Sequence, residues 1–322
     1  MAPQTSQSGP AGPRKPGPFG GWRDRLDEVR ALLGGCRACP VCCGADRLAG
    51  EAGDCGVGLA VPVTSAFGHF GEERPLSGHR GSGTIFFGGC NLRCVFCQNH
   101  DISQGPRLGQ SGRDRLFAPP ALAEVMVDLA DQGVHNVNLV SPSHVGPQVF
   151  EALGLARDQG LRLPVVWNSG GYDDVGLLEL LDGLVDIYMP DAKYWDAAVG
   201  QRLSGVADYP DVLRAALREM HRQVGDLELD DQGVAVRGLL VRHLVLPEGL
   251  AGTEGVLRFL AEDLSVHTYV NIMGQYHPAF RSHVDPRLGR APTAAEMRQA
   301  YDLAQRFGLS RLDERPARRW WL

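Results

Sequence analysis

The sequence contains very little lysine and no long apolar run. Only Lys15 and Lys193 are lysines among the 32 basic residues, and the 38 acidic residues give a net charge of −6. This balance argues against general binding to nucleic acids or to acidic membranes. No apolar run approaches the ~18 residues that a membrane helix needs, and residues 1–21 lack the apolar stretch of a signal peptide. We therefore expect a cytoplasmic protein with neither a membrane nor a nucleic-acid partner.

Several familiar catalytic motifs are absent. The chain has no Gly-x-Gly-x-x-Gly fingerprint of dinucleotide-binding folds and no phosphate-binding loop pattern. It also lacks the Gly-x-Ser-x-Gly elbow of serine hydrolases. The sequence thus gives no support to nucleotide-binding or serine-hydrolase chemistry, and the reactive groups must be sought elsewhere.

Eight cysteines are present, all within one short part of the chain. They form two groups, Cys36, Cys39, Cys42, Cys43 and Cys55, followed by Cys90, Cys94 and Cys97. A disulfide framework would spread over the whole fold, whereas local groups in a cytosolic chain of this size are typical of metal or redox sites. Both groups are therefore candidate metal-binding sites.

Composition divides the chain into four segments. Residues 1–20 are rich in Pro, Gly, Ser and Gln and are expected to be a disordered tail. Residues 21–75 are expected to be a Cys-rich segment that starts with a short amphipathic helix over Trp22–Leu33. Residues 76–280 carry the main α/β pattern, and residues 281–322 form a C-terminal extension without a readable motif, ending in Trp320-Trp321.

In the main segment, short β-rich runs alternate with amphipathic helical runs. Six strands are predicted, at Thr84–Phe87, Val137–Val140, Pro164–Trp167, Val185–Met189, Leu239–Leu246 and His267–Ile272. The predicted helices are Pro119–Gln132, Pro147–Gln159, Val175–Leu181, Asp211–Val224, Thr253–Asp263 and Ala294–Phe307, with Thr253 as a helix N-cap. Six strands each followed by a helix predict a parallel sheet, an α/β fold of the partial (β/α)₆ TIM-like barrel type, two units short of a closed barrel.

The second cysteine group has the spacing Cys-x₃-Cys-x₂-Cys on a loop directly after the first predicted strand. Three thiolates on one tight loop can bind three irons of a [4Fe–4S] cube, which leaves the fourth iron open to another ligand. The loop lies where barrel folds place their chemistry, at the carboxyl end of a strand. A zinc knuckle with a distant fourth ligand, or buried structural cysteines, is the alternative interpretation.

Cys90, Cys94 and Cys97, with Phe96 before the last, resemble the signature of the radical S-adenosylmethionine (SAM) superfamily. Longer segments resemble the PflX-type iron–sulfur proteins, which are homologous to the pyruvate formate-lyase-activating enzyme. These segments are His69-Phe70-Gly71-Glu72-Glu73, Ser77-Gly78, residues 81–87, Trp167-Asn168-Ser169-Gly170-Gly171-Tyr172 and residues 186–194. The resemblance runs from Cys36 to about Pro278.

The resemblance implies an oxidoreductase with a [4Fe–4S] cluster whose open iron binds SAM. One electron then cleaves SAM to methionine and a 5′-deoxyadenosyl radical, which abstracts a hydrogen atom from a substrate. It further implies a protein substrate such as a glycyl-radical enzyme, and a flavodoxin- or ferredoxin-type electron donor. The alternatives are a non-catalytic iron–sulfur or zinc module for electron transfer or partner binding, and an RNA-modifying enzyme, which the acidic balance disfavours.

Further residues are candidates for binding SAM. Asp191 and Lys193 end the fourth predicted strand and share one face, because the side-chain period of a strand is two; a surface ion pair is the alternative. By resemblance, Arg242 is aimed at the SAM carboxylate, His277 lies against the adenine, and Asn168-Ser169 replaces an Asp-Thr pair near the cofactor.

One position departs from the family pattern. The Gly-Gly-Glu run that binds the SAM amino group in most activating enzymes is here Val140-Ser141-Pro142-Ser143-His144. Ser141, Ser143 or backbone carbonyls would have to accept the ammonium hydrogens instead, and His144 either faces the substrate or has a structural role.

The first cysteine group is a candidate second metal site. Cys36, Cys39, Cys43 and Cys55 supply four thiolates around a Gly-rich loop, enough to saturate either an auxiliary iron–sulfur cluster or zinc. A register with Cys42 instead of Cys43 fits nearly as well. We prefer Cys43, because Cys39-Pro40-Val41-Cys42-Cys43 resembles the Cys-Pro-x-x-Cys of the family.

Overall fold

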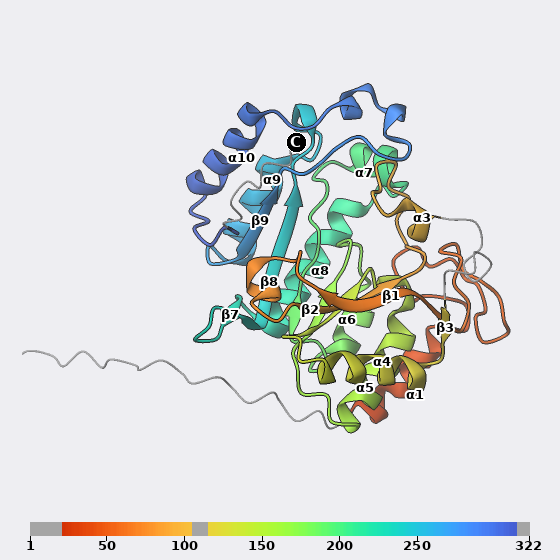
Figure 1. The fold of residues 1–322 in the computed structure, drawn as a ribbon. Helices are drawn as coiled ribbons and strands as arrows, with labels where there is room; N and C mark the ends of the chain where they lie inside the picture. The colour runs from red at the N-terminus through yellow and green to blue at the C-terminus, as the bar shows by residue number, and fades with distance from the viewer. Residues whose placement is uncertain (1–20, 105–114, 314–322) are drawn as a thin grey trace, which may run out of the picture.

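The computed structural model describes residues 21–104 and 115–313 (Figure 1). The predicted tail at 1–20 and the Trp320-Trp321 pair lie outside these residues. Within them, no helix combines the length and apolarity required to cross a membrane.

The core of the molecule is a sheet with six parallel strands in the predicted chain order. They are β2 (Ser82–Phe87), β4 (Val137–Val140), β5 (Val165–Asn168), β6 (Ile187–Tyr188), β8 (Ala235–Leu244) and β9 (Tyr269–Met273). Each pairs in parallel with the next, and no pairing joins β9 back to β2 among the described residues. The prediction of a partial, unclosed (β/α)₆ barrel is confirmed.

Most of the helices follow a strand and cover the outside of the sheet (Figure 1). The helices of the described residues are α1 (Leu26–Ala31), α2 (Arg74–Ser77), α3 (His100–Ser103), α4 (Pro119–Asp131), α5 (Gly146–Asp158), α6 (Val175–Leu181), α7 (Ala197–Ser204), α8 (Tyr209–Val224), α9 (Thr253–Phe259) and α10 (Ala294–Arg306). Short 3₁₀ turns occupy Trp22–Arg25, Ser143–Val145, Pro247–Gly249, Ser282–Val284 and Pro286–Gly289, and a π turn at Leu260–Leu264 extends α9.

One predicted helix cap is wrong. The N-cap of α9 is Gly252, at φ +66°, and Thr253 is already helical. The Thr253 hydroxyl instead lies 2.9 Å from Nε2 of the fully buried His243, whose Nδ1 lies 2.7 Å from the Ala192 carbonyl oxygen. The side chain of Thr253 is therefore committed to a tertiary contact with β8.

Three further strands were not predicted. β1 (Val61–His69) pairs antiparallel with β2, β3 (Arg115–Phe117) pairs antiparallel with β1, and β7 (Glu228–Leu229) pairs antiparallel with β8. Pro62 and Gly68 weaken the strand signal of β1, yet its pairing brings the Cys-rich segment against the barrel. Two backbone carbonyls just before β1, of Gly58 and Leu59, accept hydrogen bonds from the Gln148 side chain on α5.

Alternation along the strands gives the sheet two different faces. Outward residues such as Ile85, Leu139 and Trp167 join the large core beneath the helices. Inward residues such as Val166, Ile187, Leu240 and Met189 form a second, smaller cluster inside the barrel.

Leu76, on α2, belongs to this inner cluster and is fully buried. Its carbonyl accepts a hydrogen bond from Asn136, the residue before β4. Leu76 therefore closes the barrel at the amino-terminal ends of the strands, and the carboxyl ends are left to build a site.

Candidate metal and cofactor site

The loop that carries the second cysteine group directly follows β2 and is tied down by backbone hydrogen bonds. Arg93 and Val95 donate N–H groups to the carbonyls of Ser204 and Leu203 at the end of α7, at 3.0 and 2.9 Å. Gly89 donates to the Ile102 carbonyl at 2.9 Å. Elements on both sides of the loop thus fix its backbone at the carboxyl end of the barrel. We call residues 88–97 the SAM-cluster loop.

The three thiols of this loop each have a polar neighbour. Cys90 Sγ accepts the Leu92 N–H at 3.4 Å, Cys94 Sγ lies 3.0 Å from the Ser204 hydroxyl, and Cys97 Sγ lies 3.2 Å from the Ser103 hydroxyl. Burial raises the pKa of Cys90 to about 12 and also raises the pKa of Cys94. Cys90 and Cys94 therefore hold their protons until a metal displaces them.

This donor set suits an iron–sulfur cluster. All eight cysteines are free thiols, and within residues 21–104 and 115–313 no three His, Cys, Asp or Glu side chains converge on a space for one ion. A cube needs no such convergence, because each thiolate binds a different iron. Cys90, Cys94 and Cys97 are close enough to interact electrostatically with one another. The residues present fit a [4Fe–4S] cluster.

A cluster of charged side chains lies at the ends of the central strands. Asp191 accepts from Lys193 Nζ at 2.5 Å and from Arg242 Nε at 2.8 Å. Arg242 also donates to the Asn168 side-chain oxygen at 2.6 Å. Only 18–19% of the Asp191, Lys193 and Arg242 side chains is exposed. The alternative of a surface ion pair is therefore wrong, and four predicted cofactor residues from three strand ends meet at one place.

Electrostatics connect this charged cluster to the thiols. Burial opposes ionisation of Asp191, but Arg242 and Lys193 outweigh it and lower the pKa of Asp191. Lys193 in turn favours the thiolate forms of Cys94 and Cys90. The Lys193 ammonium therefore interacts both with the Asp191 carboxylate and with the thiols of Cys90 and Cys94.

Tyr209, on α8, holds the two strand ends together. Its hydroxyl accepts the Lys193 N–H at 3.0 Å and lies 2.7 and 2.9 Å from the carbonyl oxygens of Asp191 and Gly170. Gly171 has φ +75°, and a Cβ there would lie 2.2 Å from the Asp191 carbonyl oxygen. Glycine is thus required where the loop after β5 passes the end of β6.

Ser169 and Ser143 converge on a buried carboxylate that the sequence did not single out. Their hydroxyls donate to Asp173 at 2.5 and 2.6 Å, and Trp167 Nε1 donates to it at 3.0 Å. Burial raises the pKa of Asp173 although these three hydrogen bonds oppose the shift. Two serines from the segments that depart from the family pattern are therefore hydrogen-bonded to the same buried acid.

Two glutamates from the turn before α2 also reach the barrel interior. Glu72 lies 3.9 Å from Arg242 Nη1, and the Asn271 amide on β9 donates to Glu73 at 2.6 Å. Both belong to residues 69–73, whose resemblance to the PflX-type proteins was the only feature of the sequence that pointed to these two glutamates. They add negative charge on the far side of Arg242 from Asp191.

His277 lies apart from the charged cluster. It is exposed, and its Nδ1 is 3.2 Å from the Gln98 side-chain nitrogen, next to Cys97. The structure thus brings His277 to the SAM-cluster loop and not to Arg242. His144 is fully buried, with Nε2 at 2.9 Å from the Gly88 carbonyl and a pKa lowered by burial to about 4, and this contact favours a structural role over one facing the substrate.

Comparison with known proteins decides the family. The sequence model of the Radical SAM superfamily matches residues 84–224, the part of the chain that carries the SAM-cluster loop, Asn168 and Lys193. The chain belongs to the radical SAM superfamily. Membership in this superfamily implies a [4Fe–4S] cluster and SAM as cofactors.

The chain also resembles individual proteins. It is 32% identical over 287 residues to the protein MJ0674 of Methanocaldococcus jannaschii, whose name marks it as uncharacterized; the match covers 88% of this chain and 78% of that protein. A radical SAM methyltransferase from Sphaerobacter thermophilus gives a TM-score of 0.48 at 15% identity, covering 70% of this chain and 64% of that one. Methylornithine synthase (PylB) gives 0.47 at 17%, covering 72% and 63%. The chain thus spans less than two thirds of both solved structures.

In this radical SAM protein the first cysteine group forms a compact arrangement beside the barrel. Cys36, Cys39 and Cys55 are buried, and Cys43 is half-buried with its thiol next to that of Cys36. Burial raises the pKa of Cys39 to about 12. The four cysteines of the preferred register are therefore buried or half-buried and interact electrostatically in pairs, but their thiols do not converge on a space for one ion. Cys42 is exposed, with φ +45°.

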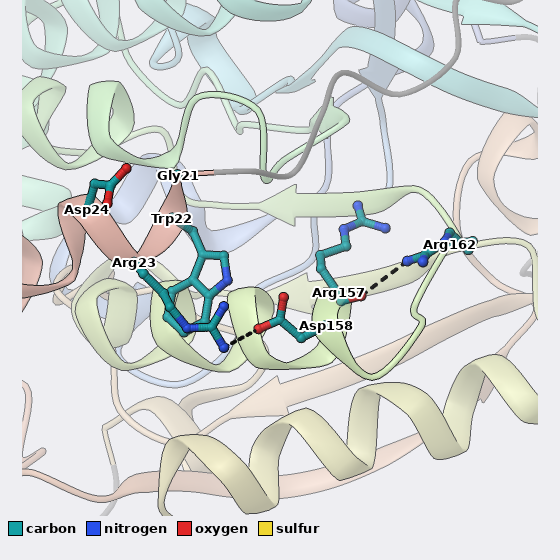
Figure 2. A pocket seen from close by; sticks show the side chains of 7 residues that line it. All are labelled: Gly21, Trp22, Arg23, Asp24, Arg157, Asp158 and Arg162. Atoms are coloured by element: carbon teal, nitrogen blue, oxygen red, sulfur yellow. Dashed lines mark hydrogen bonds and ion pairs between the residues drawn. The ribbon is translucent and has the colours of Figure 1, made fainter.

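A cavity of about 450 Å³ lies away from both cysteine groups (Figure 2). Its lining includes Trp22, the Arg23–Asp158 ion pair at 2.7 Å, and Arg162, which donates to the Arg157 carbonyl at 3.1 Å. Trp22 and Arg23 belong to the 3₁₀ turn at Trp22–Arg25, whereas Arg157 and Asp158 end α5 and Arg162 precedes β5, at the amino-terminal side of the sheet. The cavity is therefore remote from the carboxyl-end site of this radical SAM protein.

Proposed function

We propose that this protein cleaves SAM reductively and uses the resulting radical to abstract a hydrogen atom from a substrate. The observation that carries the proposal is the placement of Cys90, Cys94 and Cys97 on one anchored loop beside the Asp191–Lys193–Arg242 cluster. When bound, the [4Fe–4S] cluster supplies the electron for cleavage of the sulfonium bond of SAM.

The protein's own residues bind and orient the cofactor. Lys193 and Arg242 are the proposed partners of the SAM carboxylate, since Lys193 interacts electrostatically with Cys90 and Cys94 and Arg242 shares Asp191 with Lys193. Asp191 orients them, and Asn168 fixes the second face of the Arg242 guanidinium. The backbone carbonyls around Ser141 and Ser143 are proposed to accept the SAM ammonium hydrogens. The Ser143 hydroxyl is not available for this, because it donates to Asp173. His277, next to Gln98, is proposed to lie against the adenine.

For the substrate we propose a glycyl-radical enzyme, as in pyruvate formate-lyase activation. The family resemblance at residues 69–73 and 186–194 supports this assignment, and a flavodoxin or ferredoxin in the cytoplasm would deliver the electron. The test is to incubate the reconstituted protein with candidate glycyl-radical enzymes and record the electron paramagnetic resonance (EPR) spectrum. A glycyl radical signal that requires SAM supports the proposal, and its absence with every glycyl-radical enzyme of the host organism contradicts it.

We also propose that Cys36, Cys39, Cys43 and Cys55 bind a second metal centre, either an iron–sulfur cluster or zinc. The site is supported by the electrostatic interactions of Cys36 with Cys43 and of Cys39 with Cys36 and Cys55. Because no three of these thiols converge on a space for one ion, a polynuclear cluster suits them better than zinc. The full-length variant with Cys90, Cys94 and Cys97 all changed to Ala should retain metal through this first group alone. Elemental analysis that finds neither iron nor zinc in the anaerobically prepared variant would rule the site out, and zinc would eliminate a role in electron relay.

The main experiment is anaerobic reconstitution followed by assay of SAM turnover with dithionite. The parent should form 5′-deoxyadenosine and methionine, and Cys90→Ala, Cys94→Ala and Cys97→Ala should each abolish this activity together with the catalytic cluster. Cys42→Ala is the matched control, because its exposed thiol belongs to neither proposed site. A fully loaded parent that binds no SAM would favour the non-catalytic iron–sulfur module, and product formed by a triplet variant would refute the ligand assignment.

A further inference from the structure

Arg47 is a buried arginine between the two cysteine groups. Only 1% of the residue is exposed. Its Nη2 donates to Cys55 Sγ at 3.3 Å and its Nη1 donates to the His144 carbonyl at 2.8 Å. Its Nε has no hydrogen-bond partner among the described residues. This guanidinium is therefore enclosed by protein but incompletely hydrogen-bonded.

No carboxylate of the described residues forms an ion pair with Arg47. Arginine stays protonated in proteins, and a buried charge without a partner is strongly destabilising. Four thiols are among the groups around this cation. Arg47 interacts electrostatically with Cys36, Cys39 and Cys43 in addition to its contact with Cys55. A counter-charge can come from these four sulfurs once they are thiolates.

Arg47 also leads to the SAM-cluster loop. The residue whose carbonyl it binds, His144, contacts the Gly88 carbonyl through its ring at 2.9 Å, and Gly88 begins that loop. A second bridge runs in parallel, because Arg93 donates to the Cys90 carbonyl at 3.0 Å and to the Asp54 carbonyl next to Cys55. The two cysteine groups are thus joined by two arginines.

We propose that Arg47 is the counter-ion of a negatively charged metal–thiolate centre held by Cys36, Cys39, Cys43 and Cys55, and that it couples this centre to the SAM-cluster loop. The inference rests on the proposed second metal site. Four thiolates outweigh the charge of Zn²⁺ or of a [4Fe–4S] core, so either centre is anionic and matches a buried cation. Through the His144 carbonyl and the contact of the His144 ring with Gly88, Arg47 also acts as a positioning residue for the SAM-cluster loop.

The first experiment isolates the second centre. In the Cys90→Ala/Cys94→Ala/Cys97→Ala background, metal retention against a chelator is measured for Arg47→Gln, with Arg37→Gln, an exposed arginine of the same segment, as control. Because outer-shell partners of metal ligands are typically worth 10–100-fold in affinity, Arg47→Gln should weaken retention at least ~10-fold and Arg37→Gln should not. If the centre contains iron, Arg47→Gln should also lower its midpoint potential, since loss of a nearby positive charge disfavours the reduced form.

The second experiment compares the effect of one substitution on the melting temperature of the metal-free and the metal-loaded protein, where opposite signs are expected. Arg47→Met removes the charge but keeps much of the volume. It should raise the melting temperature of the metal-free protein, where the cation lacks a counter-charge, and lower that of the metal-loaded protein. A merely structural arginine would give the same sign in both states, and that result would overturn the proposal. Arg47→Lys, which keeps the charge, should restore most of the metal retention lost in Arg47→Gln.

Coupling is tested in the chain with all eight cysteines. Arg47→Gln should weaken SAM binding in equilibrium dialysis and alter the EPR spectrum of the SAM-bound cluster, whereas Arg37→Gln should change neither. If the second centre retains its metal equally in Arg47→Gln and in the parent, the counter-ion role fails although the metal site stands. If the background variant holds no metal, the second site itself fails, and the counter-ion role fails with it.

Discussion

Tyr209→Phe should destabilise the protein by about 2–6 kcal/mol. The hydroxyl of this fully buried residue accepts one N–H and donates its single proton to one of two carbonyl oxygens within 2.9 Å. Its removal leaves two buried backbone groups unpaired, and each costs about 1–3 kcal/mol because water cannot replace the lost partner. Tyr172→Phe is a matched control, because its ring stacks on Tyr209 at 6.1 Å but its hydroxyl binds the exposed Asp208. The loss there should stay near 1 kcal/mol.

The assay is urea unfolding under anaerobic conditions, with the change in midpoint multiplied by the common slope. Tyr209→Phe should also weaken SAM binding, since the Lys193 backbone loses its anchor, whereas Tyr172→Phe should have little effect on SAM. A Tyr209→Phe variant within about 0.5 kcal/mol of the parent, or one no less stable than Tyr172→Phe, would refute the reasoning that the hydroxyl satisfies buried backbone groups.

Three further perturbations test other parts of the site. Lys193→Met and Arg242→Gln should retain the iron of the catalytic cluster but bind SAM at least ~10-fold more weakly, because charge-assisted hydrogen bonds to a carboxylate are the strong ones; unchanged affinity in both by equilibrium dialysis would contradict their placement. Gly171→Ala should destabilise more than Gly133→Ala, since both have φ near +80° but a Cβ has nothing within 4 Å at Gly133 and meets a backbone carbonyl at 2.2 Å at Gly171; equal melting temperatures would dismiss that close approach. Burial lowers the pKa of His243 to about 4, against ~6.5 when unfolded, so its contribution to stability is complete above ~6.5 and is lost as pH falls toward 4. His243→Gln should therefore reduce the loss of unfolding free energy between pH 7 and 5 by about 2 kcal/mol, and parallel pH profiles for parent and variant would exclude this role.

The parallel strands and the helices around them were largely predictable because their patterns are local. β4 and α6 have the predicted bounds, whereas the other parallel strands and predicted helices differ at one or both ends; β2 and α8, for example, begin two residues earlier than predicted. β1 was missed since Pro62 and Gly68 interrupt its pattern, and its strand conformation depends on pairing with β2, which no local window contains.

The site was only partly predictable. The spacing of Cys90, Cys94 and Cys97 and the strand-end position of Asp191 and Lys193 are local features. The roles of Asp173 and Arg47 are not, because burial of a charged side chain is decided by partners far away in the sequence. Arg47, for example, meets the carbonyl of His144 only after folding.

The closure of the barrel by Leu76 has a kinetic consequence. With the amino-terminal end filled by an apolar side chain against β5, β6 and β8, entry to the barrel is left to its carboxyl end and to the side between β9 and β2, which do not pair among the described residues. A macromolecular substrate that covers both openings would trap whatever is already inside. Binding should then follow a compulsory order, with SAM first and the macromolecule second, and release should proceed in the reverse order. The last component to bind would then be the first to dissociate.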